Sequence, residues 1–433
     1  MKEHAGRPLL LADDVVFTCQ SCGDCCRGDW LIGVNAAEHA RLQPVDWAGH
    51  DPALGTGEKF RKIPLPLLSG ETMTFARGPS GACVFLTGES RCSIHTHLGY
   101  GAKPQVCREF PYHFVDTPDG VVAGLSFACS AVLHHQGERL ASQRGAVADV
   151  LAGSARVGTL PDPIVLYSGV DITWDQYRAI EDGLLAILGD ATVPFPRALM
   201  AGSLLVALAV SLARIEQRAS GGRGPAQTLA SGLAELAPER YRRLLDVAAT
   251  VRPPLRTTLT NLAPLYTWLE FSRRGTSRAG LVLGLYRNYF RFRRRAGRLP
   301  DLVGDSGTFD VADVDRVRFR ADDPDIGAFL REYWRHVIAR KTLVPMHGVF
   351  RGYQTLLVLY AFTRWMAKLT AHRDGRDATT LDDVRRAVRL VEQRFVLHAK
   401  FAEVFELSPV LTILADRLYR ERGFVARTVL EPA

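Results

Sequence analysis

The pattern of hydrophobic and polar positions changes near residue 130. Before it, apolar runs are short and are separated by Gly, Pro and polar residues, which predicts short strands at 13–18, 30–34, 73–76 and 121–127. After it, apolar residues recur at helical spacing over long stretches. The pattern therefore predicts an α+β chain that is mostly α, with a small mixed domain over 1–135 and a large α-helical domain over 136–433.

Helix-starting signals support this division. Asn35 is an expected N-cap, Thr173 followed by Gln176 forms an expected capping box, and Thr380 opens another helix. A short strand is expected at 164–167. The helices predicted from periodicity and turn residues are 131–152, 197–218, 226–236, 238–250, 254–272, 279–296, 325–340, 348–371, 381–405 and 408–421.

The most apolar window, Ala198 to Ala213, has 16 residues and ends at Arg214. That is shorter than the roughly 20 residues that a helix needs to span a bilayer, so we predict a buried helix and no membrane association. Near the N-terminus, the apolar run from Leu9 to Ala12 is too short for the core of a signal peptide. We therefore expect a cytoplasmic protein.

Composition is ordinary for a soluble globular chain, with 47% hydrophobic and 23% charged residues, but the net charge is +8. Part of that charge lies in 279–296, where Tyr286, Tyr289, Phe290 and Phe292 alternate with arginines. Such a composition resembles a nucleic-acid surface, yet no nucleic-acid motif accompanies it. An amphipathic helix with one core stripe and one solvated basic face is the preferred interpretation, and a nucleic-acid partner is not expected.

All eight cysteines fall in the first 129 residues: Cys19, Cys22, Cys25, Cys26, Cys83, Cys92, Cys107 and Cys129. Four of them occupy the eight-residue run Cys19 to Cys26, whose other residues are Gln, Ser, Gly and Asp, a poor core and a good ligand loop. A reducing cytosol opposes structural disulfides, so this set predicts a metal or cluster site.

Eight thiols allow two centres of four thiolates, or one complete centre and one open to substrate. If the backbone is extended there, Cys25 and Cys26 point apart, so they serve different centres or one of them is no ligand. Clustered thiolates accept both zinc and iron–sulfur centres, and the sequence does not assign the grouping.

Other side chains lie close to these cysteines in the sequence. His95, His97 and His113 could ligate a metal, but packing or exposed histidines are the preferred interpretation because the thiols suffice. Arg108 could stabilise thiolates or form an ordinary ion pair. Trp30 and Phe110 are expected to pack around the site and keep it dry.

The cysteine pattern resembles the CxxCxxCC family of zinc- or iron-chelating proteins, the YkgJ-like cysteine cluster proteins. The resemblance covers residues 15 to about 130. The motifs that carry it are the CxxCGxCC run from Cys19 to Cys26, C-x-F-L from Cys83, C-x-I from Cys92, and P-x-x-C-R-x-F-P from Pro104 to Pro111.

Within that family, the spacing around Cys92 and Cys107, Trp30 and the total length are similar to the flagellin lysine N-methylase branch. This resemblance implies a protein-lysine N-methyltransferase that uses S-adenosylmethionine, with flagellin or another protein with surface lysines as substrate. The preference for an iron–sulfur (4Fe-4S) centre over zinc also comes from the resemblance. The chain has no strand-linked G-x-G-x-x-G, so a methyl donor would be held in another way, and no catalytic or donor-binding residue is assigned.

Two other functions use the same thiols. In a non-enzymatic interaction module, the centre would stabilise the first domain and the helices would bind a partner. In a redox or electron-transfer protein, the centre would exchange electrons.

Overall fold

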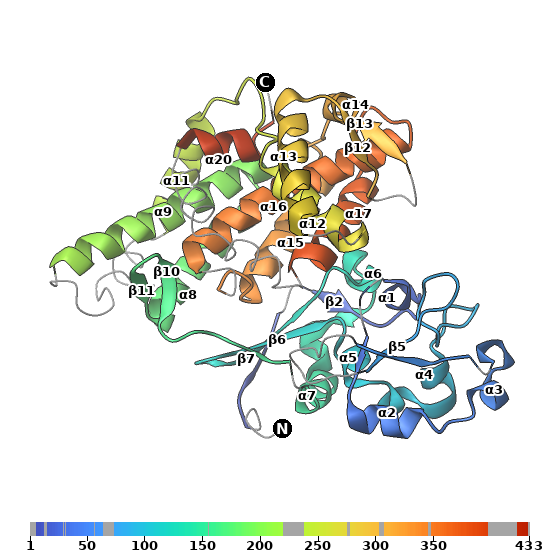
Figure 1. Ribbon diagram of the computed structural model, residues 1–433. Coiled ribbons are helices and arrows are strands. Elements are labelled where there is room, and N and C mark those ends of the chain that lie inside the picture. The colour runs from blue at the N-terminus through green and yellow to red at the C-terminus, as the bar shows by residue number, and fades with distance from the viewer. Residues whose placement is uncertain are drawn as a thin grey trace. The chain divides into compact units, whose positions relative to one another are not determined.

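The computed structural model describes residues 6–12, 15–28, 30, 32–55, 57–63, 73–154, 156–219, 238–274, 278–302, 307–344, 348–396 and 422–431. The chain separates into two compact units, Met1–Thr159 and Leu160–Ala433 (Figure 1). The domain boundary at 135 stays a prediction. Strands gather in the first unit and long helices in the second, so the fold is α+β and mostly α, as the sequence predicts.

The first unit contains a four-stranded sheet in the order β1-β7-β6-β9. Its strands are β1 Leu9–Leu11, β6 Tyr112–Thr117, β7 Gly120–Leu125 and β9 Gly158–Thr159. β6 and β7 form an antiparallel hairpin in which Thr117 pairs with Gly120. Gly120 has φ 142°, and a Cβ there would lie 2.4 Å from the carbonyl oxygen of Pro8. This turn therefore requires glycine.

A separate three-stranded sheet in the order β3-β5-β4 consists of β3 Gly33–Val34, β4 Phe60–Lys62 and β5 Met73–Phe75. Helix α2, Ala36–Leu42, starts at Asn35 with the predicted N-cap, and Glu38 completes a capping box. Against these elements packs a hydrophobic cluster that includes Trp47, Phe85 and Ile94. The remaining helices of the unit are short: α1 Asp24–Arg27, α3 Trp47–His50, α4 Ser93–Leu98, α5 Gln105–Glu109, α6 Ser130–Leu133 and α7 Arg144–Ala152.

The predicted helix over 131–152 is wrong. The segment instead forms α6, strand β8 Glu138–Arg139 and α7, and β8 pairs antiparallel with β2 Val16–Phe17. Gly137 has φ 121°, and a Cβ there would lie 2.1 Å from the Thr18 nitrogen. The close approach of the two strands breaks a helix that local periodicity favours. The strands predicted at 73–76 and 121–127 are confirmed, and those at 13–18 and 30–34 are shorter than predicted.

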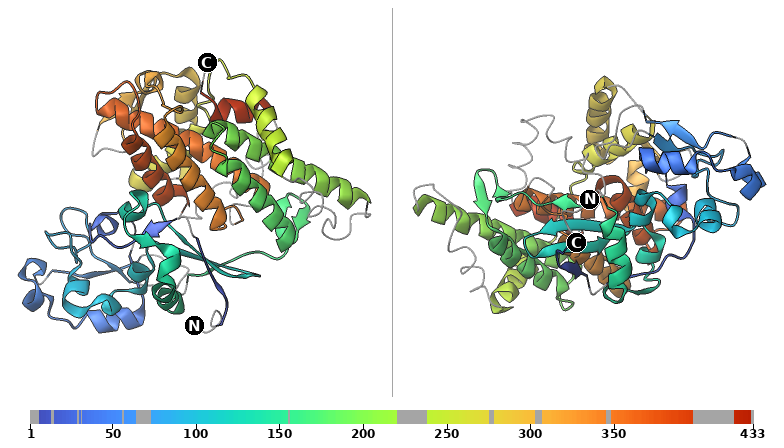
Figure 2. Two further views of the ribbon diagram at one scale, coloured as in Figure 1. Left: turned by 180° about the vertical axis from the view of Figure 1, so that it is seen from behind. Right: turned by 90° about the horizontal axis from the view of Figure 1, so that it is seen from below.

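The second unit is a helical assembly around α16 (Figure 2). Its helices are α8 Trp174–Gly189, α9 Phe195–Ala219, α11 Pro238–Thr250, α12 Leu262–Arg274, α13 Arg278–Arg294, α14 Val311–Arg316, α15 Pro324–Ala339, α16 Val349–Arg373, α17 Leu381–Val391 and α20 Arg422–Val429. Two hairpins complete it, β10 Ile164–Tyr167 with β11 Val170–Ile172, and β12 Arg298–Pro300 with β13 Thr308–Asp310.

Most helix predictions in this unit are confirmed, including the capping boxes at Thr173 and Thr380. The helix predicted over 254–272 begins only at Leu262, and the segment from Pro253 to Asn261 is irregular instead. The helix predicted over 381–405 ends at Val391 and continues as a π-helical turn, Glu392–Val396. The predicted helices 226–236 and 408–421 lie outside the described residues.

Helix α13 confirms the helix predicted over 279–296. Most of its aromatic side chains, however, do not lie in the expected core stripe. Tyr286 is 61% exposed and Phe290 is 45% exposed, whereas Phe292 is 1% exposed. The buried face meets α12 through small and polar groups: Asn288 donates to the Thr267 hydroxyl at 3.0 Å, and Gly284 lies over the same side chain. Close packing of the two helices at these positions leaves most of the aromatic residues of α13 outside.

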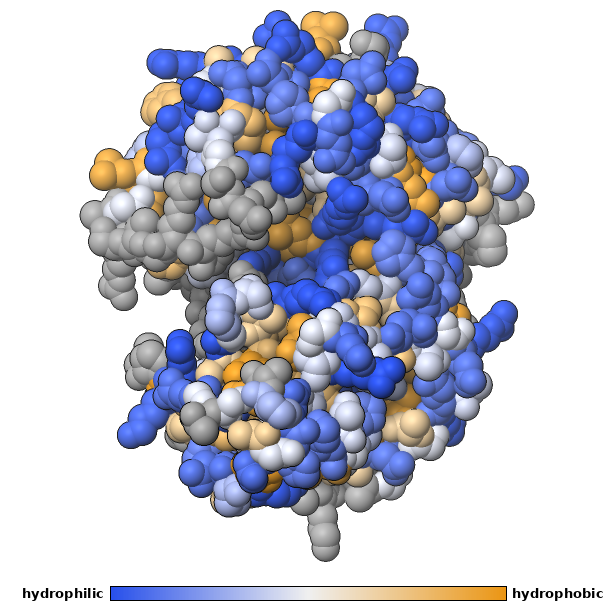
Figure 3. Space-filling model, turned by 90° about the vertical axis from the view of Figure 1, so that its right-hand side faces the viewer, coloured by the Kyte–Doolittle hydropathy of each residue, from blue (hydrophilic) through white to orange (hydrophobic). Residues whose placement is uncertain are grey.

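Helix α9 contains the most apolar window. Among the described residues, it is the one helix whose length and composition would allow it to cross a membrane, and 61% of that window is buried inside the fold. Core helices of soluble proteins have the same properties, and Leu205, Val206 and Ala209 are fully buried in α9. On the molecular face in Figure 3, hydrophilic residues cover most of the described surface and hydrophobic ones form small patches.

Ion pairs connect the helices of the second unit. Arg340 and Glu392 are buried, and two guanidinium–carboxylate bonds join them at 2.6 and 2.9 Å while the Tyr333 hydroxyl donates to the same carboxylate at 2.8 Å. Lys341 pairs with Glu181 of α8, which also accepts from the Tyr177 hydroxyl. The first pair joins the C-terminal ends of α15 and α17. The second joins α8 to the segment that follows α15.

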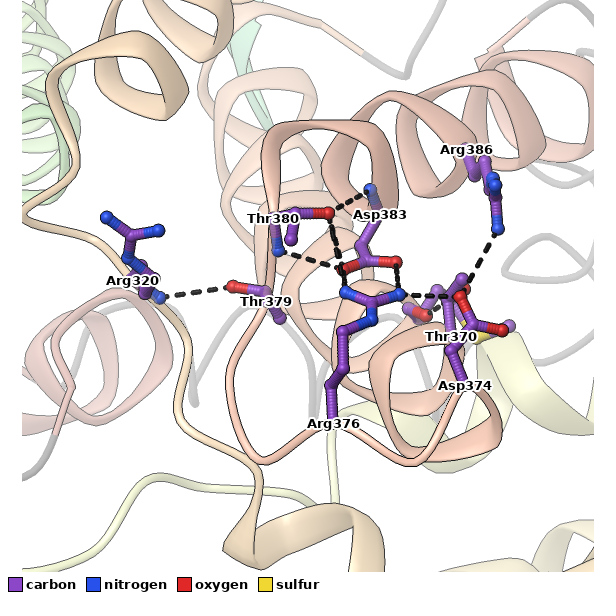
Figure 4. Close-up of polar contacts among 9 residues, drawn as sticks. Arg320, Thr370, Asp374, Arg376, Thr379, Thr380, Asp383 and Arg386 are labelled. Atoms are coloured by element: carbon purple, nitrogen blue, oxygen red, sulfur yellow. Dashed lines mark hydrogen bonds and ion pairs between the residues drawn. The ribbon is translucent and has the colours of Figure 1, made fainter.

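A more exposed network starts α17 (Figure 4). The Thr380 backbone N–H donates to Asp383 at 2.8 Å, and the Arg376 guanidinium donates to both oxygens of the Asp383 carboxylate. Arg376 also pairs with Asp374. The Thr380 N–H, the Thr380 hydroxyl and the Arg376 guanidinium thus satisfy the carboxylate that closes the capping box.

We expect Arg340→Met to lower the free energy of unfolding of the second unit by about 3–5 kcal/mol, because the substitution leaves the buried Glu392 carboxylate without this cation. The measurement is urea unfolding followed by far-ultraviolet circular dichroism. The control is Arg316→Met, whose exposed pair with Asp313 should contribute at most about 1 kcal/mol. Equal losses in the two variants would contradict the prediction.

Candidate metal centre

The run from Cys19 to Cys26 is a tight loop that follows β2. Ser21 and Gly23 both have left-handed backbones, with φ 53° and 73°, and Gly23 is the N-cap of α1, which carries Cys25 and Cys26. A Cβ on Gly23 would lie 2.9 Å from a methyl group of Leu86. Glycine at this position therefore lets the loop turn closely against the segment that carries the next cysteines.

Two arginines hold the carbonyl groups of this loop. Arg27 donates to the Cys22 oxygen at 2.7 Å. Arg77 donates to the Cys26 oxygen at 3.3 Å and also to the Trp30 oxygen. Both guanidinium groups place positive charge next to the thiols while fixing the backbone that carries them.

The other four cysteines come from four separate places. Cys83 lies in a bridge with Arg77, and Cys92 lies in a bridge with Leu86 and precedes α4. Cys107 lies within α5, and Cys129 precedes α6. Tertiary packing therefore has to gather the thiols, since no local loop could.

Seven of the eight cysteines line one cavity of about 260 Å³: Cys19, Cys22, Cys25, Cys26, Cys92, Cys107 and Cys129. The eighth, Cys83, is 5% exposed within the hydrophobic cluster. A larger cavity of about 480 Å³ in the same unit, between His39, Trp47 and Lys59, contains no cysteine. The chemistry that the sequence predicts thus maps to the smaller cavity.

The donor set of this cavity fits a thiophilic metal. Soft thiolates bind zinc and iron–sulfur centres in preference to magnesium or calcium. The sulfur atoms of Cys25 and Cys26 lie 3.9 Å apart. Among the described residues, however, no three Cys, His, Asp or Glu side chains are gathered closely enough to hold one metal ion. The thiols surround a space rather than a single point.

Burial makes several of these thiols hard to ionise. Desolvation raises the pKa of Cys83 to about 11 and that of Cys129 to about 11, and it also raises the pKa of Cys107. The pKa of Cys25, in contrast, is lowered, chiefly by its hydrogen bond with the adjacent Cys26 and also by the nearby Lys103 ammonium. The pKa of Cys26 is raised by the same hydrogen bond and by burial. Cys25 is therefore the thiolate of the adjacent pair.

Lys103 is the main cation of the cavity wall, and the sequence analysis did not single it out. Burial lowers its pKa, but the thiolates of Cys107, Cys92, Cys25 and Cys19 outweigh that effect and leave the pKa raised. Its ammonium group lies 5.4 Å from the centre of the Tyr100 ring. The sequence offered one hint that Lys103 lies near the thiols, since it directly precedes the P-x-x-C motif that starts at Pro104.

The structure separates the three candidate histidines. His95 lines the cavity and packs edge-on against Tyr100, with ring centres 5.7 Å apart. His97 packs on His50 at 5.1 Å, and His113 lies on β6; neither lines the cavity. Of the three, His95 is the one that could reach a group bound there.

The other predicted neighbours divide in the same way. Phe110 lines the cavity and packs on Trp30, with ring centres 5.4 Å apart, which matches the expectation that these side chains pack around the site. Arg108 lies outside the lining and over the Tyr100 ring, at 5.8 Å from its centre. Tyr112 and Ser130 also line the cavity, although no sequence motif predicted that they would.

Comparison with known proteins bears on this unit. The model of the CxxCxxCC family, described as a putative zinc- or iron-chelating domain, matches residues 18–130. No curated protein and no solved structure matches the chain. The match contains all eight cysteines and supports zinc or iron binding by this part of the chain, whereas the similarity to the flagellin lysine N-methylase branch stays a prediction.

In the metal-free chain, we expect iodoacetamide to alkylate Cys25 at lower pH than Cys129, because the pKa of Cys25 is lowered and only the thiolate reacts. Tandem mass spectrometry across a pH series would measure both rates. Lys103→Gln should move the Cys25 profile to higher pH, whereas Lys62→Gln, which removes an exposed lysine on β4, should not. Identical profiles for Cys25 and Cys129 would refute this assignment.

Proposed function

We propose that residues 18–130 bind an iron–sulfur centre in the thiol-lined cavity. The observation that supports this proposal is the arrangement of seven cysteines around about 260 Å³. A zinc ion takes four thiolates at about 2.3 Å, which brings their sulfur atoms to about 3.8 Å from one another and leaves no space between them. Seven thiols around a cavity fit a centre of several metal and sulfide atoms better.

The surrounding residues suit such a centre. Lys103, Arg27 and Arg77 place positive charge beside the thiolates and offset part of their negative charge. Phe110 lines the cavity and is held in place by packing on Trp30, and an apolar wall limits access of water, which is one of the factors that set a reduction potential. The bound centre would supply the positive charge that lets the buried thiols ionise.

Anaerobic purification should yield a coloured protein that contains iron and acid-labile sulfide in similar amounts, because each cluster of this kind holds both. The measurements are metal analysis, sulfide analysis and the visible absorption spectrum. A colourless protein that holds zinc and no labile sulfide would instead support a zinc domain and refute the iron–sulfur proposal.

For the activity, we propose a protein-lysine N-methyltransferase, on the strength of the resemblance in the cysteine motifs. The cavity offers an aromatic wall of Tyr100, Phe110 and Tyr112. Methyl transfer forms a bond between the lysine nitrogen and the methyl carbon and breaks the carbon–sulfur bond of the donor, so the ammonium must first lose its proton. Desolvation at an apolar wall lowers the pKa of an amine, whereas the thiolates of this cavity raise the pKa of Lys103, so the loss is favoured at the aromatic wall and away from the thiolates.

Incubation of the anaerobically purified chain with methyl-labelled S-adenosylmethionine and flagellin should label flagellin lysines. Binding of the donor, measured by calorimetry, separates two negative outcomes. If the donor binds and flagellin stays unlabelled, the substrate is another protein. If the donor does not bind, the non-enzymatic module or the redox function replaces the methyltransferase proposal.

A further inference from the structure

Four cysteines belong to the buried side of the site. Cys83 lies in the hydrophobic cluster, and Cys26, Cys92 and Cys107 pack against the same cluster. The Cys83 N–H donates to the Cys26 carbonyl at 2.8 Å. The turn that follows, closed by a bond from Leu86 to the Cys83 oxygen, brings Leu86 into its bridge with Cys92.

Cys107 joins this group from α5, because it packs against the same cluster. Backbone contacts and packing against one hydrophobic cluster thus define one set: Cys26, Cys83, Cys92 and Cys107.

The other four cysteines are neither members of that hydrophobic cluster nor packed against it. Cys19 and Cys22 are exposed, and Cys25 and Cys129 are half-buried.

Hydrogen bonds hold this second set together across the sequence. The Ser130 hydroxyl donates to the Asp24 carboxylate, which joins the neighbours of Cys129 and Cys25. The Thr18 N–H donates to the Gln136 oxygen at 3.0 Å, and the Gln136 N–H donates to the Ala131 oxygen at 2.8 Å. Cys19 is therefore held beside the start of α6.

Cys25 and Cys26 are the point where the two sets meet. They are consecutive residues of α1, and a helix turns consecutive side chains about 100° apart. Cys26 packs against the hydrophobic cluster and its carbonyl accepts from the Cys83 N–H, whereas the neighbours of Cys25 and Cys129 are joined by the hydrogen bond from Ser130 to Asp24. One residue can thus serve each set, with their sulfur atoms 3.9 Å apart.

We propose that the domain holds two adjacent metal centres, a buried one on Cys26, Cys83, Cys92 and Cys107 and an exposed one on Cys19, Cys22, Cys25 and Cys129. This assignment rests on the proposed metal-binding function and extends it. The first centre stabilises the fold around the hydrophobic cluster. The second, whose ligands include the exposed Cys19 and Cys22, is the centre that small molecules can reach.

A matched pair of substitutions tests the assignment. Cys92 and Cys129 are both half-buried, and each is the N-cap of a short helix, where serine is well tolerated. In the anaerobically purified full chain, Cys92→Ser and Cys129→Ser should each retain about half of the total iron plus zinc, since each disables one of two centres. The double variant C92S/C129S should retain almost none, whereas C92S/C107S should retain as much as C92S. Circular dichroism reports whether each variant folds.

Three outcomes are informative in different ways. A wild-type chain without metal would refute the proposed function itself. A wild-type chain with zinc in place of iron, but with the same pattern of losses, would refute the iron–sulfur proposal and support two centres. Complete loss of metal in both single variants, or equal losses in C92S/C107S and C92S/C129S, would overturn the division into two sets.

Metal release from the wild-type chain gives a second test, and the two single variants extend it. With excess chelator, iron should leave in a fast phase from the exposed centre and a slow phase from the buried one. C92S should keep the fast phase and C129S should lack it. A single phase in the wild-type chain would contradict the proposal, as would loss of the fast phase in C92S.

Discussion

The first unit depends on a conflict between burying thiols and ionising them. The packing that brings cysteines together from five separate places also desolvates them, and it raises the pKa of Cys83 and Cys129 well above neutral pH. A metal ligand must be a thiolate, so the positive charge of a bound centre has to compensate. Because the unfolded chain cannot present this arrangement, the free energy of metal binding also contributes to the stability of the unit.

The surrounding residues offset the cost of ionising a buried thiol to different extents on the two sides of the site. Near the exposed side, Lys103 and the hydrogen bond from Cys26 already favour the thiolate of Cys25. On the buried side, Cys83 is enclosed by apolar groups such as Phe85. One side of the site can therefore exchange ligands with solvent, whereas the other resembles the interior of a small protein core. Such a difference suits a domain in which one centre maintains structure and another is available for chemistry.

The second unit is stabilised in a different way. Its helices bury a continuous apolar core around α16, in which Tyr353, Tyr360 and Phe362 are fully buried. Buried ion pairs such as Arg340 with Glu392 fix the ends of its helices by geometry, since each is costly to break once both charges are desolvated.

The sequence alone determined the division into a cysteine-rich mixed part and a helical part, the helix caps at Asn35, Thr173 and Thr380, and the eight thiols, because these depend on local patterns and residue types. Only tertiary structure decided that 131–152 is not one helix, since β8 pairs with a strand far away in the sequence. It likewise decided which α13 side chains are exposed and that Lys103 lines the thiol cavity. The sequence leaves the grouping of the thiols open because it depends on contacts between residues up to about 110 positions apart, which no local pattern encodes.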